Sequence, residues 1–176
     1  GRISAEKGPL QNLSAFEALH RTYPNSRFTI IGDGPLAGAL DAALAQSPAR
    51  AAVDRLGFRA AAEVADILSR CHVLLQHSRI ANGSIEGFGV TLTEAGAAGL
   101  PQIATRVGGL PDQLEYGRNG FLFEPDDIAA QTAAMLRMAT DEPLRPRMGA
   151  AARTVAGGFD STAQARRLET LILGLI

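Results

Sequence analysis

Short apolar segments of strand length alternate with longer segments of helix length along the 176 residues of the chain. The short segments, such as Phe28–Ile31 and Gly120–Phe123, are nearly unbroken apolar runs. Unbroken runs are typical of strands covered on both faces, and a helix after each strand is typical of parallel pairing. The pattern therefore predicts an α/β fold, a three-layer αβα sandwich with a parallel sheet.

The predicted elements place the polar and glycine-rich clusters at one edge of that sheet. We expect strands at residues 28–31, 52–56, 73–76, 102–104 and 120–123. We expect helices at residues 10–21, 36–46, 61–69, 91–98, 110–116, 128–140, 143–156 and 161–175. The clusters lie at residues 1–8, 32–35, 57–59, 77–89 and 105–109. Ligands of open parallel sheets bind beyond the carboxyl ends of the strands, where these clusters lie.

Composition excludes several classes of protein. The formal net charge of −1 favours neither nucleic acid nor an anionic membrane as a partner. No apolar run approaches the roughly 18 residues that span a bilayer, and no secretory signal is visible. The single cysteine, Cys71, fits a reducing compartment and predicts a buried, inert thiol. We expect a cytoplasmic protein, which at full length can lie at the inner membrane surface, and we interpret the chain as a fragment.

The stretch from Glu86 to Glu94 carries the clearest functional pattern. An acid, a glycine-rich turn, the residues Val90-Thr91 and a second acid lead into a run of small residues. This order is typical of a loop that enters a helix. Glycines let the backbone approach a ligand, and the first amides of the helix favour an anion such as a diphosphate. The two carboxylates can accept hydrogen bonds from hydroxyl groups on either side.

Two further clusters can contribute to such a site. Arg2 and Lys7 form a short basic loop. An arginine can donate two parallel hydrogen bonds to phosphate oxygens, and a lysine supplies a compact positive charge. His77 and Ser78 follow the third predicted strand, where a histidine can orient a sugar hydroxyl. No group of His, Cys, Asp and Glu has metal-ligand spacing, so the sequence predicts no metal site.

The segment Gly32-Asp33-Gly34-Pro35-Leu36-Ala37 fits a variant of the dinucleotide-binding fingerprint. Asp54 would then be the acid expected about 20 residues later. Two alternatives remain: a tight strand-to-helix turn with Pro35 in the first helical turn, or a loop that lines a nucleotide pocket. Gly108-Gly109 opens another helix, either as a permissive entry or as a second backbone wall of the site.

Taken in order, these motifs resemble the donor-binding, C-terminal half of the retaining glycosyltransferases of family 4, which have the two-domain GT-B architecture. The resemblance covers essentially the whole chain and implies a Rossmann-like fold. The matching segments are Gly1-Arg2, Glu6-Lys7-Gly8, Phe28 to Pro35, Leu56-Gly57, Ser78, Glu86 to Glu94, Gly99 to Gly109, Asn119 to Leu122 and Asp126-Asp127.

The resemblance implies a role for each matching position. Arg2 and Lys7 would bind the donor diphosphate, Glu86 would contact the donor sugar, and these residues would form the catalytic set. Glu94 would hold the ribose hydroxyls. The other donor-binding residues expected are Gly57, Phe58 and Arg59 near the base, His77 and Ser78, and the stretch Gly87, Phe88, Gly89, Val90 and Thr91.

The implied activity is transfer of a hexose from a nucleotide diphosphosugar, with retention of configuration, in polysaccharide or glycoconjugate synthesis. The implied partners are the nucleotide sugar and an N-terminal acceptor domain of the same protein, with no cofactor and no metal. The isolated fragment is expected to be inactive. Alternatives are a non-catalytic nucleotide-binding module, another GT-B-type enzyme such as a sugar-nucleotide epimerase, and, more distantly, an NAD-dependent oxidoreductase.

Overall fold

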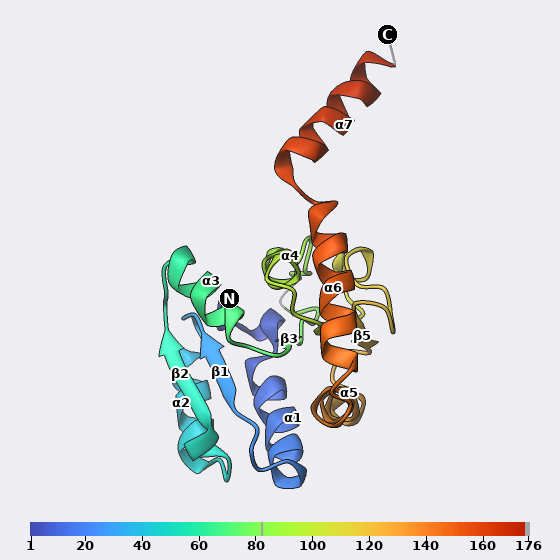
Figure 1. Cartoon of the computed structure of the whole chain (residues 1–176). Helices are drawn as coiled ribbons and strands as arrows, with labels where there is room; N and C mark the ends of the chain where they lie inside the picture. Colours follow the sequence, from blue (N-terminus) through green and yellow to red (C-terminus); the bar gives the residue numbers. More distant parts are fainter. Residues whose placement is uncertain (82, 175–176) are drawn as a thin grey trace.

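The structure is a computed structural model that describes residues 1–81 and 83–174 (Figure 1). The strands are β1 Phe28–Ile31, β2 Val53–Gly57, β3 Leu74–Gln76, β4 Gln102–Thr105 and β5 Gly120–Phe123. The helices are α1 Pro9–Thr22, α2 Ala37–Gln46, α3 Ala61–Ser69, α4 Val90–Ala97, α5 Ile128–Thr140, α6 Leu144–Gly157 and α7 Ser161–Leu173. Short 3-10 turns are η1 Ala5–Lys7, η2 Arg50–Ala52 and η3 Leu110–Asp112. The strand and helix order predicted from the sequence is confirmed.

One predicted helix is wrong in length. The segment 110–116 forms only the turn η3, and Tyr116 instead bridges to Gly120. The side chain of Asn119 accepts a hydrogen bond from the Glu115 amide at 2.7 Å and donates to the Gln113 carbonyl at 2.9 Å. These local bonds offer the backbone an alternative to a helix. The predicted last helix also extended to Leu175, which lies outside the described residues.

All strand pairs are parallel, as predicted, but the ladder is not continuous. β1 pairs with β2, and β3, β4 and β5 pair in that order in a separate sheet. Among the described residues no strand pairs with both β1 and β3. The predicted parallel direction of the strands is confirmed, and among the described residues the strands form two ladders rather than one.

The first seven residues, Gly1–Lys7, connect the carboxyl ends of the two sheets, and we call them the N-terminal bridge. The Gly1 amino group donates to the Ile31 carbonyl at 2.8 Å, and the Ile3 amide donates to the Asp33 carbonyl at 2.9 Å. At the other end, the amide of Arg79, just past β3, donates to the Glu6 carbonyl at 2.9 Å. The bridge thus brings a basic loop to the strand ends.

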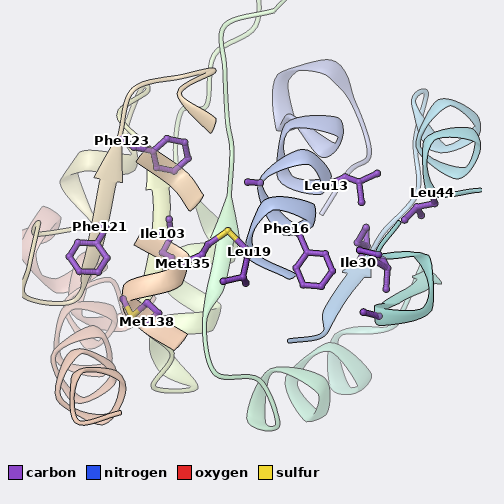
Figure 2. Packing of buried hydrophobic residues seen from close by; sticks show 14 of the residues in the cluster. Leu13, Phe16, Leu19, Ile30, Leu44, Ile103, Phe121, Phe123, Met135 and Met138 are labelled. Atoms are coloured by element: carbon purple, nitrogen blue, oxygen red, sulfur yellow. The ribbon is translucent and has the colours of Figure 1, made fainter. Parts of the chain in front are cut away.

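Alternation along the strands gives the larger sheet two buried faces. Ile103 in β4 and Phe121 in β5 join the main core cluster, whereas their neighbours Ala104 and Leu122 join a second cluster on the other face. The main cluster also contains side chains from α1, β1, α5 and α6, so it spans both sheets. Figure 2 shows Leu19 of α1 beside Met135, among the side chains of this core. The layers are those of an αβα sandwich.

Helices α4 and α6 pack closely because glycines line their contact. A methyl group on Gly149 of α6 would overlap the Gly99 carbonyl oxygen, and one on Gly96 of α4 would lie 3.0 Å from the Ala156 Cβ. Helix α7 projects away from the rest of the fold (Figure 1). Within residues 1–81 and 83–174, no helix combines the length and hydropathy that crossing a membrane requires.

A buried histidine ties α5 to the end of β3. The His77 side chain is fully buried, and its Nε2 accepts the amide of Asp126 at 3.0 Å. Its Nδ1 lies 2.7 Å from Gln131 Oε1, so Nδ1 carries the proton and the ring is neutral. Burial lowers the pKa of His77, as does nearby Arg79, against the opposing effects of Gln131 and Asp126.

We predict that Gly149→Ala destabilises the chain by about 1–3 kcal/mol, because the added methyl group forces α6 away from the Gly99 carbonyl. Gly157→Ala, in the same helix, is the matched control, since a methyl group there meets nothing within 4 Å. Urea denaturation of both variants measures the difference. Equal stability of the two variants would contradict the close packing of α4 and α6.

The neutral His77 ring predicts a pH dependence of stability. Because the pKa of the folded state lies below the ordinary 6.5, the unfolded chain binds more protons between the two values. Stability is therefore complete above pH 6.5 and is lost as the pH falls below it. We expect His77→Gln to show a shallower loss over this range, and His72→Gln, at an exposed position, to match the wild type. Identical pH profiles for the His77 variant and the wild type would contradict this.

Candidate functional site

The stretch from Glu86 to Glu94 is a loop that enters a helix, as predicted. Glu86 precedes the loop, α4 begins at Val90, and Glu94 lies in the second turn of that helix. Gly89 is the N-cap residue, and no side chain caps the helix. The two acids therefore flank the amino end of α4.

At this helix start, fewer backbone amides lack a hydrogen-bond acceptor than the sequence suggested. Val90 donates to the Phe88 carbonyl, and Leu92 donates to the Gly89 carbonyl. In the described part of the chain, the amides of Gly87, Phe88 and Thr91 have no recorded acceptor. Because Thr91 is the one free amide of the first turn, the loop before the helix supplies the other two. These three amides, which we call the amide cradle, remain free to donate to a ligand, and a helix start favours an anion.

A buried glutamine holds the cradle in shape. In the orientation that pairs every donor with an acceptor, the Gln113 side chain accepts the Gly89 amide at 3.0 Å. The same side chain donates to the Gly89 carbonyl at 3.1 Å and to Thr93 Oγ1 at 2.8 Å. Sequence reasoning did not identify Gln113, because an isolated glutamine before a turn has no distinctive spacing.

Gly108 and Gly109 lie directly against the backbone of the Glu86 loop, and the expectation that they form a wall of the ligand site stays a prediction. The Gly109 amide donates to the Glu86 carbonyl at 3.1 Å. A methyl group on Gly108 would overlap that carbonyl, and one on Gly109 would overlap the carbonyl of Gly87. Glycine is required here because two backbone segments are in direct contact.

Glu86 gathers donors from three segments. Its Oε2 accepts from Lys7 Nζ of the N-terminal bridge, from Gln76 Nε2 at 3.0 Å and from Ser78 Oγ at 3.2 Å. The sequence predicted that Lys7, Ser78 and Glu86 share a site, and the structure brings them together. Gln76 was missed, because its strand was interpreted only as an apolar run.

The second acid and the first basic residue point away from such contacts. Glu94 is exposed, and its side chain makes no hydrogen bond or ion pair among the described residues. Burial lowers the pKa of the Gly1 amino group, and the Glu94 carboxylate opposes that shift, which puts Glu94 near the start of the N-terminal bridge. Arg2 is exposed beside Gly1. Both side chains remain available to a ligand.

Gly57 is the last residue of β2 in the smaller sheet, and Phe58 and Arg59 follow it. The Phe58 side chain is 76% exposed. Arg59 donates to the Phe58 carbonyl at 2.8 Å, and its Nε lies 3.7 Å from Glu63. In the Glu86 loop, the Phe88 ring packs edge-on against Phe159 at 5.4 Å. An exposed aromatic ring at a strand end is suited to stacking on a planar group.

The His77 ring does not face the amide cradle as a free group. It is fully buried, and its two nitrogens bond to the Asp126 amide and to Gln131. The expectation that this ring orients a sugar hydroxyl therefore lacks support, whereas the neighbouring Ser78 hydroxyl contacts Glu86. The buried ring positions the chain at the strand end.

The geometry around Gly32 argues against a dinucleotide site. A methyl group on Gly32 would overlap the Gly1 carbonyl, and one on Gly34 would lie 2.5 Å from the Ile3 carbonyl, so these glycines accommodate the N-terminal bridge. Asp54 pairs with Arg27 at 3.0 Å and is the second residue of β2, so it does not lie at the carboxyl end of the strand, where a ribose acceptor would be expected. Pro35 lies just before α2 rather than in its first turn.

Two smaller expectations concern metal and cysteine. In the residues that the structure describes, no group of three or more His, Cys, Asp or Glu side chains could hold a metal ion. Cys71 is only half-buried, where the sequence predicted a buried thiol, and burial raises the pKa of that thiol. A thiol with a raised pKa is a poor nucleophile at neutral pH, as expected for an inert cysteine.

Comparison with known proteins shows what this chain is similar to. The chain is 31% identical over 142 residues to the amylovoran biosynthesis glycosyltransferase AmsK of Erwinia amylovora, a match that covers 80% of this chain and 35% of AmsK. The pneumococcal O-GlcNAc transferase GtfA, solved with UDP and GlcNAc, superposes with a TM-score of 0.84 at 25% identity over 98% of this chain and 34% of GtfA. Anabaena HepE, solved with UDP, gives a TM-score of 0.82 at 25% identity over 97% of this chain and 46% of HepE.

This chain therefore spans between a third and a half of the length of these proteins. The structural similarity confirms the predicted Rossmann-like fold, which is that of the C-terminal half of the GT-B architecture. A family model described as glycosyl transferases group 1 matches residues 1–155. With that model matching most of its length, the chain belongs to the group 1 glycosyltransferase family.

Proposed function

We propose that this chain is the donor-binding domain of a retaining glycosyltransferase that transfers a hexose from a nucleotide diphosphosugar in polysaccharide or glycoconjugate assembly. The observation that carries the proposal is the amide cradle with a carboxylate on each side, Glu86 and Glu94. The name of AmsK supports polysaccharide assembly, and the UDP bound to GtfA and HepE supports a nucleotide diphosphate.

The diphosphate would lie against the cradle amides, with Arg2 and Lys7 as its cationic partners. Lys7 is paired with Glu86 and its side chain is 30% exposed. The Glu86 carboxylate is only 11% exposed, but it also accepts hydrogen bonds from Gln76 and Ser78, so a diphosphate that draws Lys7 away does not leave it without partners. Donor binding would then shift Lys7 from Glu86 to the phosphate oxygens.

The chemistry of transfer fits these groups. Negative charge grows on the leaving diphosphate as the sugar acquires oxocarbenium character. Fixed amides and two cations stabilise that charge, and losing one such donor costs about 10²–10³-fold in rate. We propose retention of configuration by displacement on one face, guided by the leaving phosphate. We also propose that the reaction needs neither a cofactor nor a resident metal ion.

Glu94 would accept hydrogen bonds from the ribose hydroxyls. We predict that Glu94→Ala weakens binding of UDP at least about tenfold, because hydrogen bonds to a charged acceptor are the stronger kind. Isothermal titration calorimetry measures the change. Glu142→Ala, an exposed acid outside this site, is the matched control and should bind as the wild type does. Unchanged affinity of the Glu94 variant would contradict the assignment.

The acceptor would be bound by a part of the full-length protein that this chain does not contain. We therefore predict that the chain binds a nucleotide sugar but transfers sugar far more slowly than the full-length protein. A radiolabelled-donor turnover assay on both proteins measures this difference. Equal rates would overturn the proposed division into two domains, and binding without turnover in both would favour a non-catalytic module.

A further inference from the structure

We propose that Gln76 is a positioning residue that, together with Ser78, keeps the Glu86 carboxylate in place when Lys7 turns to the diphosphate. This inference rests on the proposed function, because it assigns the means by which the same site keeps its sugar-facing acid oriented. Gln76 belongs to none of the motifs identified from the sequence.

Gln76 is the last residue of β3 and pairs in register with Ala104 of β4. Two residues earlier on the same face, Leu74 packs in the apolar core, so an apolar side chain would suit position 76 as well. Gln76 is nevertheless buried, with 7% exposure, and its Nε2 donates to Glu86 Oε2 at 3.0 Å. The amide thus supports the carboxylate from the interior.

All recorded donors to Glu86 meet the same oxygen. Lys7, Gln76 and Ser78 donate to Oε2, and among the described residues nothing donates to Oε1. A carboxylate oxygen has two lone pairs, so Oε2 is saturated and Oε1 keeps its acceptor capacity. This one-sided arrangement fixes the carboxylate and leaves the other oxygen for a hydroxyl of the ligand.

The Gln76 amide makes its hydrogen bonds through its nitrogen. Its Oε1 is buried and has no hydrogen-bond partner among the described residues. An unsatisfied buried acceptor destabilises a fold, and an apolar side chain of the same shape would avoid that cost. What the glutamine contributes is therefore its Nε2, which donates to Glu86 Oε2 at 3.0 Å and to Ser78 Oγ at 3.2 Å.

Ser78 supplies the second fixed donor. Its carbonyl accepts a hydrogen bond from Thr105 Oγ1 at 2.6 Å, and its side chain is fully buried. Gln76 and Ser78 are thus anchored within the sheet, whereas Lys7 lies on the N-terminal bridge and is partly exposed. When Lys7 leaves for the diphosphate, the two anchored donors stay on Glu86.

The test compares two ligands in Gln76→Met, a change that keeps the shape of the side chain and removes its donors. UDP reports on the diphosphate contacts, and UDP-GlcNAc adds the sugar; GDP and GDP-mannose form the second pair. By calorimetry, we expect the variant to bind the nucleoside diphosphate as the wild type does and to bind the nucleotide sugar about tenfold more weakly.

Gln102→Met is the matched control. Gln102 is also buried, its Nε2 donates to the Leu92 carbonyl at 2.6 Å, and its Oε1 also lacks a partner. Both affinities should stay unchanged in this variant. If Gln76→Met lowers both affinities equally, or neither, the positioning role is overturned. Should that variant fail to fold, Ser78→Ala carries the same comparison.

A wild-type chain that binds neither ligand pair would count against the proposed function instead. The positioning claim is then tested without ligand, by crystal structures of Lys7→Ala and of the double variant Lys7→Ala/Gln76→Met, in which the Lys7 contact is absent. A Glu86 carboxylate that rotates only in the double variant supports the claim. A carboxylate that holds the same orientation on Ser78 alone overturns it.

Discussion

Direct contact between backbone segments at the carboxyl edge of the strands is the constraint on which the site depends. Gly32 lies against the Gly1 carbonyl, Gly8 lies against that of His77, and Gly109 lies against that of Gly87. A side chain at any of these glycines would overlap a carbonyl oxygen. The contacts fix the N-terminal bridge and the Glu86 loop relative to each other, so that Lys7 reaches Glu86.

This packing explains how an exposed loop can be preorganised. The Glu86 loop has the Gly109 amide on its Glu86 carbonyl and the Gln113 side chain on Gly89. Its free amides are therefore held in position before any ligand arrives. Fixed dipoles stabilise developing charge without having to reorganise, which is the main advantage of a site built from backbone.

The sequence predicted the strands and the loop-to-helix motif, because apolar runs and the spacing of Glu86 and Glu94 are local signals. The absence of a ladder between β1 and β3 was not predictable, because an apolar run does not indicate which strand it will pair with. Gln76 and Gln113 escaped for a related reason. Their importance comes from partners far away in the chain. The burial of the His77 ring was not foreseen either, because it depends on the packing of α5.

Among the described residues the two sheets share no ladder, so their coupling rests on the N-terminal bridge and on the side chains of α1 that reach the common core, Leu13, Phe16 and Leu19 among them. Side-chain packing resists separation but does not fix register as a ladder would. A ligand that extended from Arg59 to Glu94 would contact both sheets at their carboxyl ends, just as α1 contacts both on one face. Binding of a ligand would then stabilise the whole fold rather than one loop.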